Sequence, residues 1–487
     1  METAGLWMLA AVAILLVATG LPAWVVLIGV AVAAAGAGAA AGAVPLPLLA
    51  GIPSRLLGLL ENDLLQALPL YVLMGAMLNR LPLADILFRS LSRGLRVTGA
   101  GAALGGLSLG VLLAPMNGSV GAGVAMLTRT VLPRLTAARV PTARGAALVC
   151  VASTLGVVVP PSLVLILFGD AMLRAHTEAV NLTHQAVRIV NTQDVFRGAL
   201  VPVALLLLLC ALAAWWANRG GASPHEEDRG KRLALKEWIT AVLAAMCIVV
   251  LLGGVTLGYL YAVEAAAAGG VALCLYGLAT RALTRVALTE ILRDTMAVTG
   301  ALFALLVGAT VFTLVARAFG TDRFVASWLA AMGGNGDQAL VTVLLLLGLC
   351  AFVLDAFEMI FVVIPIVMPP LLTRVPDATW VAVLTLLILQ ASFLIPPLGY
   401  AVLMVRNRLH DPVPTIRLVR ALAPFLVAQL VVLATVYAYP ALVWRGPPTV
   451  AVPGASVQPM SDDDARALFE RQLEQNEEGA PRSQQHD

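Results

Sequence analysis

The sequence predicts an all-α polytopic membrane protein made of two inverted repeats, each with a re-entrant helical hairpin and a proline-broken span. Three observations predict this fold class. The chain is 60% hydrophobic and only 12% charged, and its mean hydropathy is +0.92. Two apolar regions of about 35 residues carry a polar break in the middle. Two pairs of adjacent prolines, 236 residues apart, interrupt otherwise matching apolar segments.

Apolar runs long enough to cross a bilayer recur from end to end of the chain. A helical span needs about 20 mostly apolar residues. Runs such as VPVALLLLLCALAAWWA are apolar on every face, whereas a transmembrane β-strand alternates apolar and polar residues. The candidate spans are 4–19, 22–42, 64–79, 143–174, 196–217, 237–257, 259–280, 293–316, 378–406 and 418–443.

The beginning of the chain does not have the basic segment with which a signal peptide starts. The first basic residue is Arg55. We therefore interpret residues 4–20 as a retained span, and residues 1–63 as a unit of N-terminal scaffold spans.

Composition and motifs argue against several classes of function. The net charge is +3, and no basic stripe stands apart from the membrane loops, so we expect no nucleic-acid partner. The five cysteines are scattered singly through apolar runs, which indicates packing residues and neither a disulfide framework nor a zinc site. We find no nucleophile–base pair, metal-ligand cluster or phosphate-binding glycine loop, and we predict that the protein is not an enzyme.

The two long regions, 100–134 and 338–373, are predicted to be hairpins. A straight helix of 35 residues is about 52 Å long, far more than the ~30 Å hydrocarbon core. The first region is interrupted by APMNGSVGAG and the second by VLDAFEM. Two shorter helices that meet at a tip inside the membrane fit both regions better.

Equal spacings show that the chain contains one unit twice. Ser119 lies 41 residues before Pro160, and Asp355 lies 41 residues before Pro396. Each unit consists of a span, an amphipathic arm, a hairpin and a broken span; the arms are expected near 83–95 and 320–333. The expected organisation is 1–63 N-terminal scaffold, 64–174 repeat 1, 175–292 scaffold spans with a cytoplasmic linker 218–236, 293–406 repeat 2, 407–443 a C-terminal span and 444–487 a polar tail.

Basic residues indicate that the second unit is inverted relative to the first. The positive-inside rule assigns arginine-rich connections to the cytoplasm. The first hairpin is flanked by many arginines, whereas the loops beside the second hairpin carry one. The first hairpin is therefore expected to enter from the cytoplasm and the second from outside, with both termini outside. The arginines flanking the first hairpin are Arg89, Arg93, Arg96, Arg129, Arg134, Arg139 and Arg144.

The proline pairs predict backbone carbonyls without hydrogen-bond donors. Proline has no amide hydrogen, so it leaves the carbonyl four residues earlier unbonded. In lipid such a carbonyl costs several kcal/mol unless something satisfies it, and transporters use unwound helices of this kind to hold a coupling cation. The alternative is a kink that serves packing alone. The carbonyls concerned are those of Gly156, Val157, Ser392 and Phe393.

Three acidic residues in apolar surroundings are further candidates. Asp355 and Glu358 lie near the second hairpin tip. An aspartate at mid-membrane costs roughly 2.5–3.5 kcal/mol, so it usually faces a cavity or a partner; the alternative is a tip that is open to water. Glu264 lies between two spans, where it either caps the following helix or belongs to a site.

Several long segments, in this order, resemble the large membrane subunit of tripartite ATP-independent periplasmic (TRAP) transporters, the DctM-like permease. The resemblance covers about 45–440. The last segment is most similar to the branch labelled mannitol/chloroaromatic compound transport. The matching segments are LPLYVLMGAMLNRLPLADILF, NGSVGAGVAMLTRTVLPRL, ASTLGVVVPPSLVLILFGD, EAAAAGG, GLCAFVLDAFEMIFVVIPIVMPPLL and LQASFLIPPLGYAVLMVRN.

The resemblance implies an elevator-type ion transporter fold in the bacterial inner (cytoplasmic) membrane. It implies import of an organic acid with Na⁺ as coupling ion, without another cofactor or a transition metal. It also implies two protein partners, a small four-span membrane subunit (DctQ-like) and a periplasmic substrate-binding protein (DctP-like). Stand-alone ion-coupled carboxylate transport, antiport, and a scaffold subunit that moves nothing are the alternatives.

The resemblance further implies that the hairpin tips and the proline-pair regions bind Na⁺. Glu264 matches a family glutamate, but Tyr261, Ala262 and Val263 precede it where the family has Thr-Pro-Thr, so a hydroxyl role is not expected there. Glu264 and Glu358 are secondary candidates. The implied site residues are Asn117, Gly118, Ser119, Gly156, Pro160, Pro161, Ser162, Asp355, Ser392, Pro396, Pro397 and Gly399.

Overall fold

The computed structural model describes residues 3–42, 51–61, 63–113, 119–184, 188–219, 235–332, 336–396, 399–409 and 413–444. Three predicted site residues, Asn117, Gly118 and Pro397, lie outside these ranges. So do most of the linker 218–236 and all of the polar tail after residue 444. Within the described ranges every regular element is a helix, which confirms the predicted all-α class.

Six helices in the described ranges are long and apolar enough to cross a membrane, which confirms a multi-pass membrane protein. They are α2 (Ala23–Ala40), α12 (Thr192–Asn218), α14 (Leu235–Leu257), α15 (Ala262–Ala279), α16 (Arg285–Ala318) and α23 (Thr415–Ala438). Helix α1 (Ala4–Thr19) is shorter, and α4 (Ile52–Leu60) precedes the first repeat. Helix α16 begins eight residues before the predicted span because the hydroxyl of Thr284 accepts a hydrogen bond from the Ala287 amide and caps it.

The first repeat contains a sharp turn between a span and an amphipathic arm. Helix α6 is bent 70° away from α5, and it buries Leu83, Leu87 and Phe88 on one face. A hairpin and an interrupted span follow. The elements are α5 (Asp63–Arg80), α6 (Leu83–Gly94), the 3₁₀ turn η1 (Arg96–Thr98), α7 (Gly101–Leu113), α8 (Val120–Thr130), α9 (Leu132–Ala137), α10 (Thr142–Thr154), η3 (Leu155–Val157) and α11 (Leu163–Thr183).

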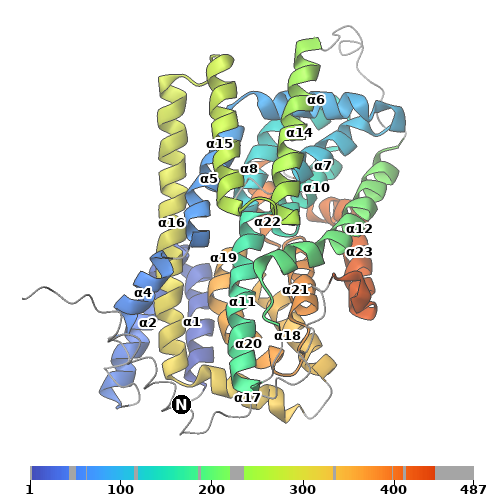
Figure 1. Cartoon of the computed structure of the whole chain (residues 1–487). Coiled ribbons are helices and arrows are strands. Elements are labelled where there is room, and N and C mark those ends of the chain that lie inside the picture. The colour runs from blue at the N-terminus through green and yellow to red at the C-terminus, as the bar shows by residue number, and fades with distance from the viewer. Residues whose placement is uncertain are drawn as a thin grey trace, which may run out of the picture. The chain divides into compact units, whose positions relative to one another are not determined.

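The second repeat has the same order of elements and the opposite direction. In Figure 1 the arm α6 and helix α7 lie in the upper part of the view, whereas α17 and α18 lie in the lower part. After α16, the elements of the second repeat are α17 (Thr321–Ala331), α18 (Gly336–Cys350), α19 (Ala356–Glu358), the π-helical turn η4 (Met359–Val363), α20 (Ile364–Leu372), α21 (Ala378–Ser392) and α22 (Tyr400–Arg408). The chain then continues through α23 to the turn η5 (Pro440–Leu442).

Both broken spans stop and restart at the predicted places. Helix α10 ends at Thr154, and α11 begins at Leu163 after the proline pair. Helix α21 ends at Ser392, and α22 begins at Tyr400. Helix α11 is longer than predicted, since it continues for nine residues beyond the expected end of the broken span at residue 174.

Each hairpin packs closely against the broken span of its own repeat. A Cβ atom at Gly110 of α7 would lie 2.5 Å from the Cβ of Ala152 on α10, so only glycine allows this approach. In the second repeat, a Cβ at Gly348 of α18 would lie 3.4 Å from the Ser392 hydroxyl. The two broken spans also contact each other through α10 and α22. Hairpins and broken spans therefore share one packed core.

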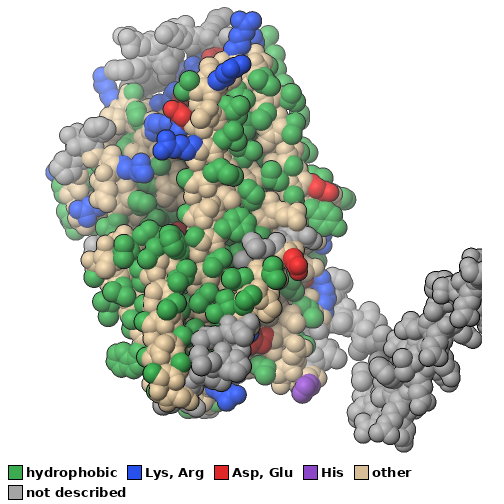
Figure 2. All heavy atoms as spheres, turned by 90° about the vertical axis from the view of Figure 1, so that its left-hand side faces the viewer, with side chains coloured by type: hydrophobic (Ala, Val, Ile, Leu, Met, Phe, Trp, Pro, Cys, Tyr) green, Lys and Arg blue, Asp and Glu red, His purple; other side chains and the backbone are tan. Residues whose placement is uncertain are grey.

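Basic side chains gather at one end of the membrane unit. In Figure 2 most of the visible Lys and Arg side chains lie toward the upper end. The arginines of the first repeat form several ion pairs, including Arg80 with Asp294 at 2.7 Å and Arg134 with Asp85 at 2.9 Å. By the positive-inside rule, the basic end of the membrane unit is the end expected in the cytoplasm.

Candidate functional site

Two serines predicted as site residues begin helices next to the first break. The Ser119 hydroxyl accepts a hydrogen bond from the Ala122 amide at 3.1 Å and caps α8. The buried Ser162 does the same for α11, with the Leu165 amide at 3.1 Å. Capping is the ordinary structural role of serine at such positions. Both capped helix ends lie near the break: α11 begins directly after Ser162, and a Cβ at Gly123 in the first turn of α8 would lie 3.3 Å from Ser153 at the end of α10. The N-terminal end of a helix carries a partial positive charge.

The first break retains carbonyls without donors, as the proline pair predicts. Pro160 and Pro161 are buried, and a cis peptide bond joins them. The Leu155 carbonyl accepts hydrogen bonds from the amides of Val158 and Val159. Among the described residues, no hydrogen bond ends on the carbonyls of Gly156 or Val157. Two backbone oxygens are thus available at this break.

At the second break the prediction of free carbonyls is wrong. The Phe393 carbonyl accepts a hydrogen bond from the Ala401 amide at 3.2 Å, and the Ser392 carbonyl accepts one from Ile395 at 3.3 Å. The reason is that the segment after α21 folds back in a turn, so amides beyond the break replace those that the prolines do not supply. Gly399 allows this turn, because a Cβ there would lie 2.6 Å from the Phe393 oxygen.

The acidic pair at the second hairpin tip is only partly satisfied. The Asp355 amide donates to the Glu358 carboxylate at 3.0 Å, so Glu358 helps to start α19. The Oδ1 atom of Asp355 is buried and has no hydrogen-bond partner in the described part of the chain. An unpaired buried carboxylate oxygen is costly, and a cation is one way to satisfy it. Asp355 is therefore the strongest single ligand candidate among the described residues.

Tyr400 is a candidate site residue that sequence reasoning missed. A Cβ at Gly121 of the first hairpin would lie 3.3 Å from the Tyr400 hydroxyl, and α22, which begins at Tyr400, packs against α8 of that hairpin. The Phe393 ring lies 6.4 Å from the Tyr400 ring. Tyr400 therefore brings the start of α22 against the first hairpin. Its place directly after Gly399 was the signal available in the sequence.

Glu264 has a structural role. Its carboxylate is exposed and accepts a hydrogen bond from the Tyr261 amide at 2.9 Å. The helix that it caps, α15, packs against α5 and α14. The structure thus favours the capping interpretation of Glu264 over a direct role in the site.

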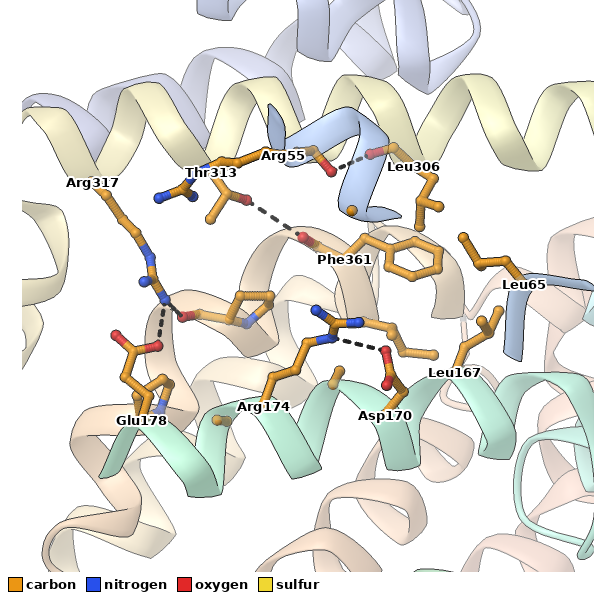
Figure 3. A pocket seen from close by; sticks show the side chains of 17 residues that line it. Arg55, Leu65, Leu167, Asp170, Arg174, Glu178, Leu306, Thr313, Arg317 and Phe361 are labelled. Carbon is orange, nitrogen blue, oxygen red and sulfur yellow. Dashed lines mark hydrogen bonds and ion pairs between the residues drawn. The ribbon is translucent and has the colours of Figure 1, made fainter. Parts of the chain in front are cut away.

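A charged pocket is the second feature that sequence reasoning missed. It has a volume of about 490 Å³ and lies between α4, α5, α11, α16 and the second hairpin (Figure 3). Asp170, Arg174 and Glu178 follow one another at four-residue intervals, which places them on one face of α11. Asp170 and Arg174 lie in the predicted broken span 143–174 and Glu178 lies just beyond it, and this spacing of charges was the signal. The polar and charged lining residues are Arg55, Asp170, Arg174, Glu178, Thr310, Thr313 and Arg317.

Two of the three arginines in this pocket are paired. Arg174 contacts Asp170 at 3.0 Å, and Arg317 contacts Glu178 at 2.8 Å (Figure 3). Arg55 forms no ion pair with any described residue. A free guanidinium in a pocket of this size can bind a small carboxylate through two parallel hydrogen bonds.

The arrangement of the two repeats in the fold indicates the class of membrane protein. Inverted repeats, opposed hairpins and interrupted spans around a shared core form the fold of a secondary transporter. The structure is similar to the Alcanivorax borkumensis YdaH transporter, with a TM-score of 0.55 over 82% of this chain and 90% of that chain. The sequence identity is 15%, so this similarity concerns the fold alone.

The family follows from sequence comparison. The family model "Tripartite ATP-independent periplasmic transporter, DctM component" matches residues 10–442, and the chain belongs to this family. It is 25% identical to the sialic acid TRAP transporter large permease protein SiaM of Vibrio cholerae, over 80% of this chain and 87% of SiaM. It is 24% identical to the C4-dicarboxylate TRAP transporter large permease protein DctM of Pseudomonas aeruginosa, over 78% and 86% of the two chains. The predicted family is confirmed.

Proposed function

We propose that this protein is the transport subunit of an importer that carries an organic acid inward with Na⁺. The observation that carries the proposal is the buried Oδ1 of Asp355, which has no partner in the described residues at a hairpin tip beside a broken span. The unbonded carbonyls of Gly156 and Val157 support it from the other repeat. Carboxylate, carbonyl and hydroxyl oxygens are hard ligands that suit an alkali ion better than a soft transition metal.

The proposed Na⁺ ligands form one group in each repeat. Ser119, the Gly156 region and the Pro160–Ser162 segment belong to the first group. Asp355, Ser392, Pro396 and Gly399 belong to the second. Because the Phe393 and Ser392 carbonyls are already bonded, the second group depends mainly on the Asp355 carboxylate, whereas the first depends on backbone oxygens. Asn117, Gly118 and Pro397 belong to the proposed groups by resemblance to the family.

The charged pocket is the proposed place for the organic acid. Relatives of this chain are named for sialic acid and C4-dicarboxylates, which all carry a carboxylate. Arg55 supplies a guanidinium without an ion pair in the described residues, and Arg174 and Arg317 lie on the facing walls. The pocket touches α11 and the second hairpin on one side and α16 on the other, so it lies between the elements that the elevator mechanism would move apart.

The proposed movement is that of an elevator. The two hairpins and two broken spans, which pack on each other, would move as one unit against α2, α5, α15 and α16. The arms α6 and α17 connect the two groups, and the 70° bend before α6 lets that arm lie across the spans. A small four-span subunit and a periplasmic binding protein are the proposed partners, and the bacterial inner membrane is the proposed location.

Transport in proteoliposomes tests the proposal. The protein is reconstituted with its small membrane subunit, and the binding protein is supplied outside with a radiolabelled organic acid. We expect uptake only with an inward Na⁺ gradient and only with the binding protein. Equal uptake without the binding protein would indicate a stand-alone carrier. No uptake under any gradient, with correctly inserted protein, would favour a scaffold subunit.

A further inference from the structure

Among the described residues, a charged hydrogen bond joins the end of α5 to the first hairpin. The guanidinium of Arg129, the last residue but one of α8, donates to the backbone carbonyl of Asn79. Asn79 is in turn the last residue but one of α5. The bond therefore connects the helix that precedes the first arm with the second limb of the first hairpin.

The end of α16 is joined to the second hairpin in a corresponding way. Arg317, the last residue but one of α16, donates to the Pro365 carbonyl of α20 at 2.9 Å. The same nitrogen contacts the Glu178 carboxylate of α11 at 2.8 Å. Figure 3 shows the Arg317 side chain reaching across the end of the pocket to both acceptors.

These two connections occupy matching places in the repeats. Arg129 and Pro365 are 236 residues apart, which is the spacing of Ser119 and Asp355 and also that of the proline pairs. At the other end of each bond stands the penultimate residue of the helix before the arm. The donor lies on the hairpin in the first repeat and on the long helix in the second. The bond therefore occurs at matching places in the two repeats, although the donor and the acceptor have changed sides.

We propose that these bonds are a pair of clasps, one at each membrane face, that stabilise the present position of the hairpins against α5 and α16. This inference rests on the proposed elevator movement. A hydrogen bond weakens steeply beyond about 3.5 Å, so any slide of the hairpins by several ångströms breaks both clasps. The ion pair of Arg80 with Asp294 has both partners on α5 and α16 and persists through the same slide.

The two clasps differ in strength. The Arg129 clasp is one bond to a neutral carbonyl, whereas the Arg317 clasp combines a carbonyl with a carboxylate. Hydrogen bonds between charged partners contribute more than those with one neutral partner. Removing the Arg317 guanidinium therefore shifts the balance of conformations further than removing that of Arg129.

Spin-label distance measurements on the full-length chain test the clasps. Leu292→Cys on α16 and Leu403→Cys on α22 are both exposed positions, and they carry the labels after the five native cysteines are replaced. One distance population corresponds to the position of the hairpins in this structure, and the other to hairpins that have moved along α5 and α16. We expect Arg129→Gln to raise the ratio of the moved population to the unmoved one by roughly fivefold or more. Arg317→Gln raises it further, and Arg129→Lys restores much of the original ratio because it keeps a charged donor.

Two matched variants control for loss of charge. Arg96→Gln and Arg323→Gln remove exposed arginines in η1 and on α17. The side chains of these two arginines form no ion pair with the described residues. If the clasp variants give the same ratio as these controls, the clasps are refuted while the elevator stands. If all variants show one Na⁺-independent distance, the proposed elevator movement itself is wrong. Arg129 lies at the surface, so its variant remains informative even where Arg317→Gln does not fold.

Discussion

At the scale of single residues, Asp355 combines burial with an unsatisfied oxygen. We predict that Asp355→Asn raises the Na⁺ concentration for half-maximal uptake at least roughly tenfold, since a carboxylate–Na⁺ contact in a partly dry site contributes more than ~1.4 kcal/mol. Proteoliposome uptake at varied Na⁺ measures this. Glu264→Gln is the matched control, because that carboxylate caps α15 and is exposed. Unchanged Na⁺ dependence of Asp355→Asn would remove Asp355 from the site.

Gly399 is a residue whose missing side chain matters. A Cβ there would lie 2.6 Å from the Phe393 oxygen and 2.9 Å from the Ile395 oxygen, and both atoms are rigid backbone. We predict that Gly399→Ala lowers stability by about 1–3 kcal/mol, because the turn must open. Thermal unfolding in detergent measures the effect. Gly300→Ala is the control, since a Cβ on that helix meets no neighbouring element within 4 Å. Equal melting temperatures for the two variants would contradict the prediction.

At the scale of elements, the first break depends on the proline pair. Replacing Pro161 with alanine supplies an amide that can donate to the Val157 carbonyl four residues earlier. We predict that Pro161→Ala removes a backbone oxygen from the proposed Na⁺ group and weakens Na⁺-driven uptake severalfold. Pro202→Ala in the continuous helix α12 is the matched control. If both variants depend on Na⁺ like the original protein, the break serves packing.

The pocket also belongs to this scale, because several elements supply its walls. We predict that Arg55→Gln raises the KM for the organic acid about tenfold, the effect of losing one charge-assisted contact, without changing the Na⁺ dependence. Initial uptake rates at varied concentrations of the loaded binding protein measure it. Arg323→Gln, outside the pocket lining, serves as control. An altered Na⁺ dependence with an unchanged KM would place Arg55 in another role.

At the scale of the whole molecule, the inverted repeats predict opposite exposure of the two arms. Val97 is 98% exposed just after α6, and Arg323 is exposed on α17. In a cysteine-free background, we predict that a charged maleimide labels Val97→Cys only from the cytoplasm and Arg323→Cys only from outside. Spheroplasts and inverted vesicles provide the two sides. Labelling of both positions from the same side would contradict the inversion.

Much of the candidate site could be predicted from local sequence. A proline pair does not by itself end a helix, since Pro369 and Pro370 lie inside α20. At residues 160–161 and 396–397, however, the pair removes amide donors where the sequence predicts a break, and Ser119, Ser162 and Asp355 begin helices through equally local capping. These features do not depend on distant parts of the chain. The hydrogen bond that the Phe393 carbonyl accepts could not be predicted from the sequence, because it depends on how the chain after α21 folds back to the Ala401 amide.

The sequence by itself determined the class of the protein, its repeats, the places where helices break and its family. Hydropathy, proline chemistry and spacing act over short distances along the chain, so they can be read without coordinates. Only the tertiary structure decided that Tyr400 lies against Gly121 of the first hairpin, that Arg55 shares a pocket with Arg317, and that Arg129 reaches Asn79. These contacts join residues far apart in the chain. The packing of whole helices brings these residues together, and no local sequence pattern predicts that packing.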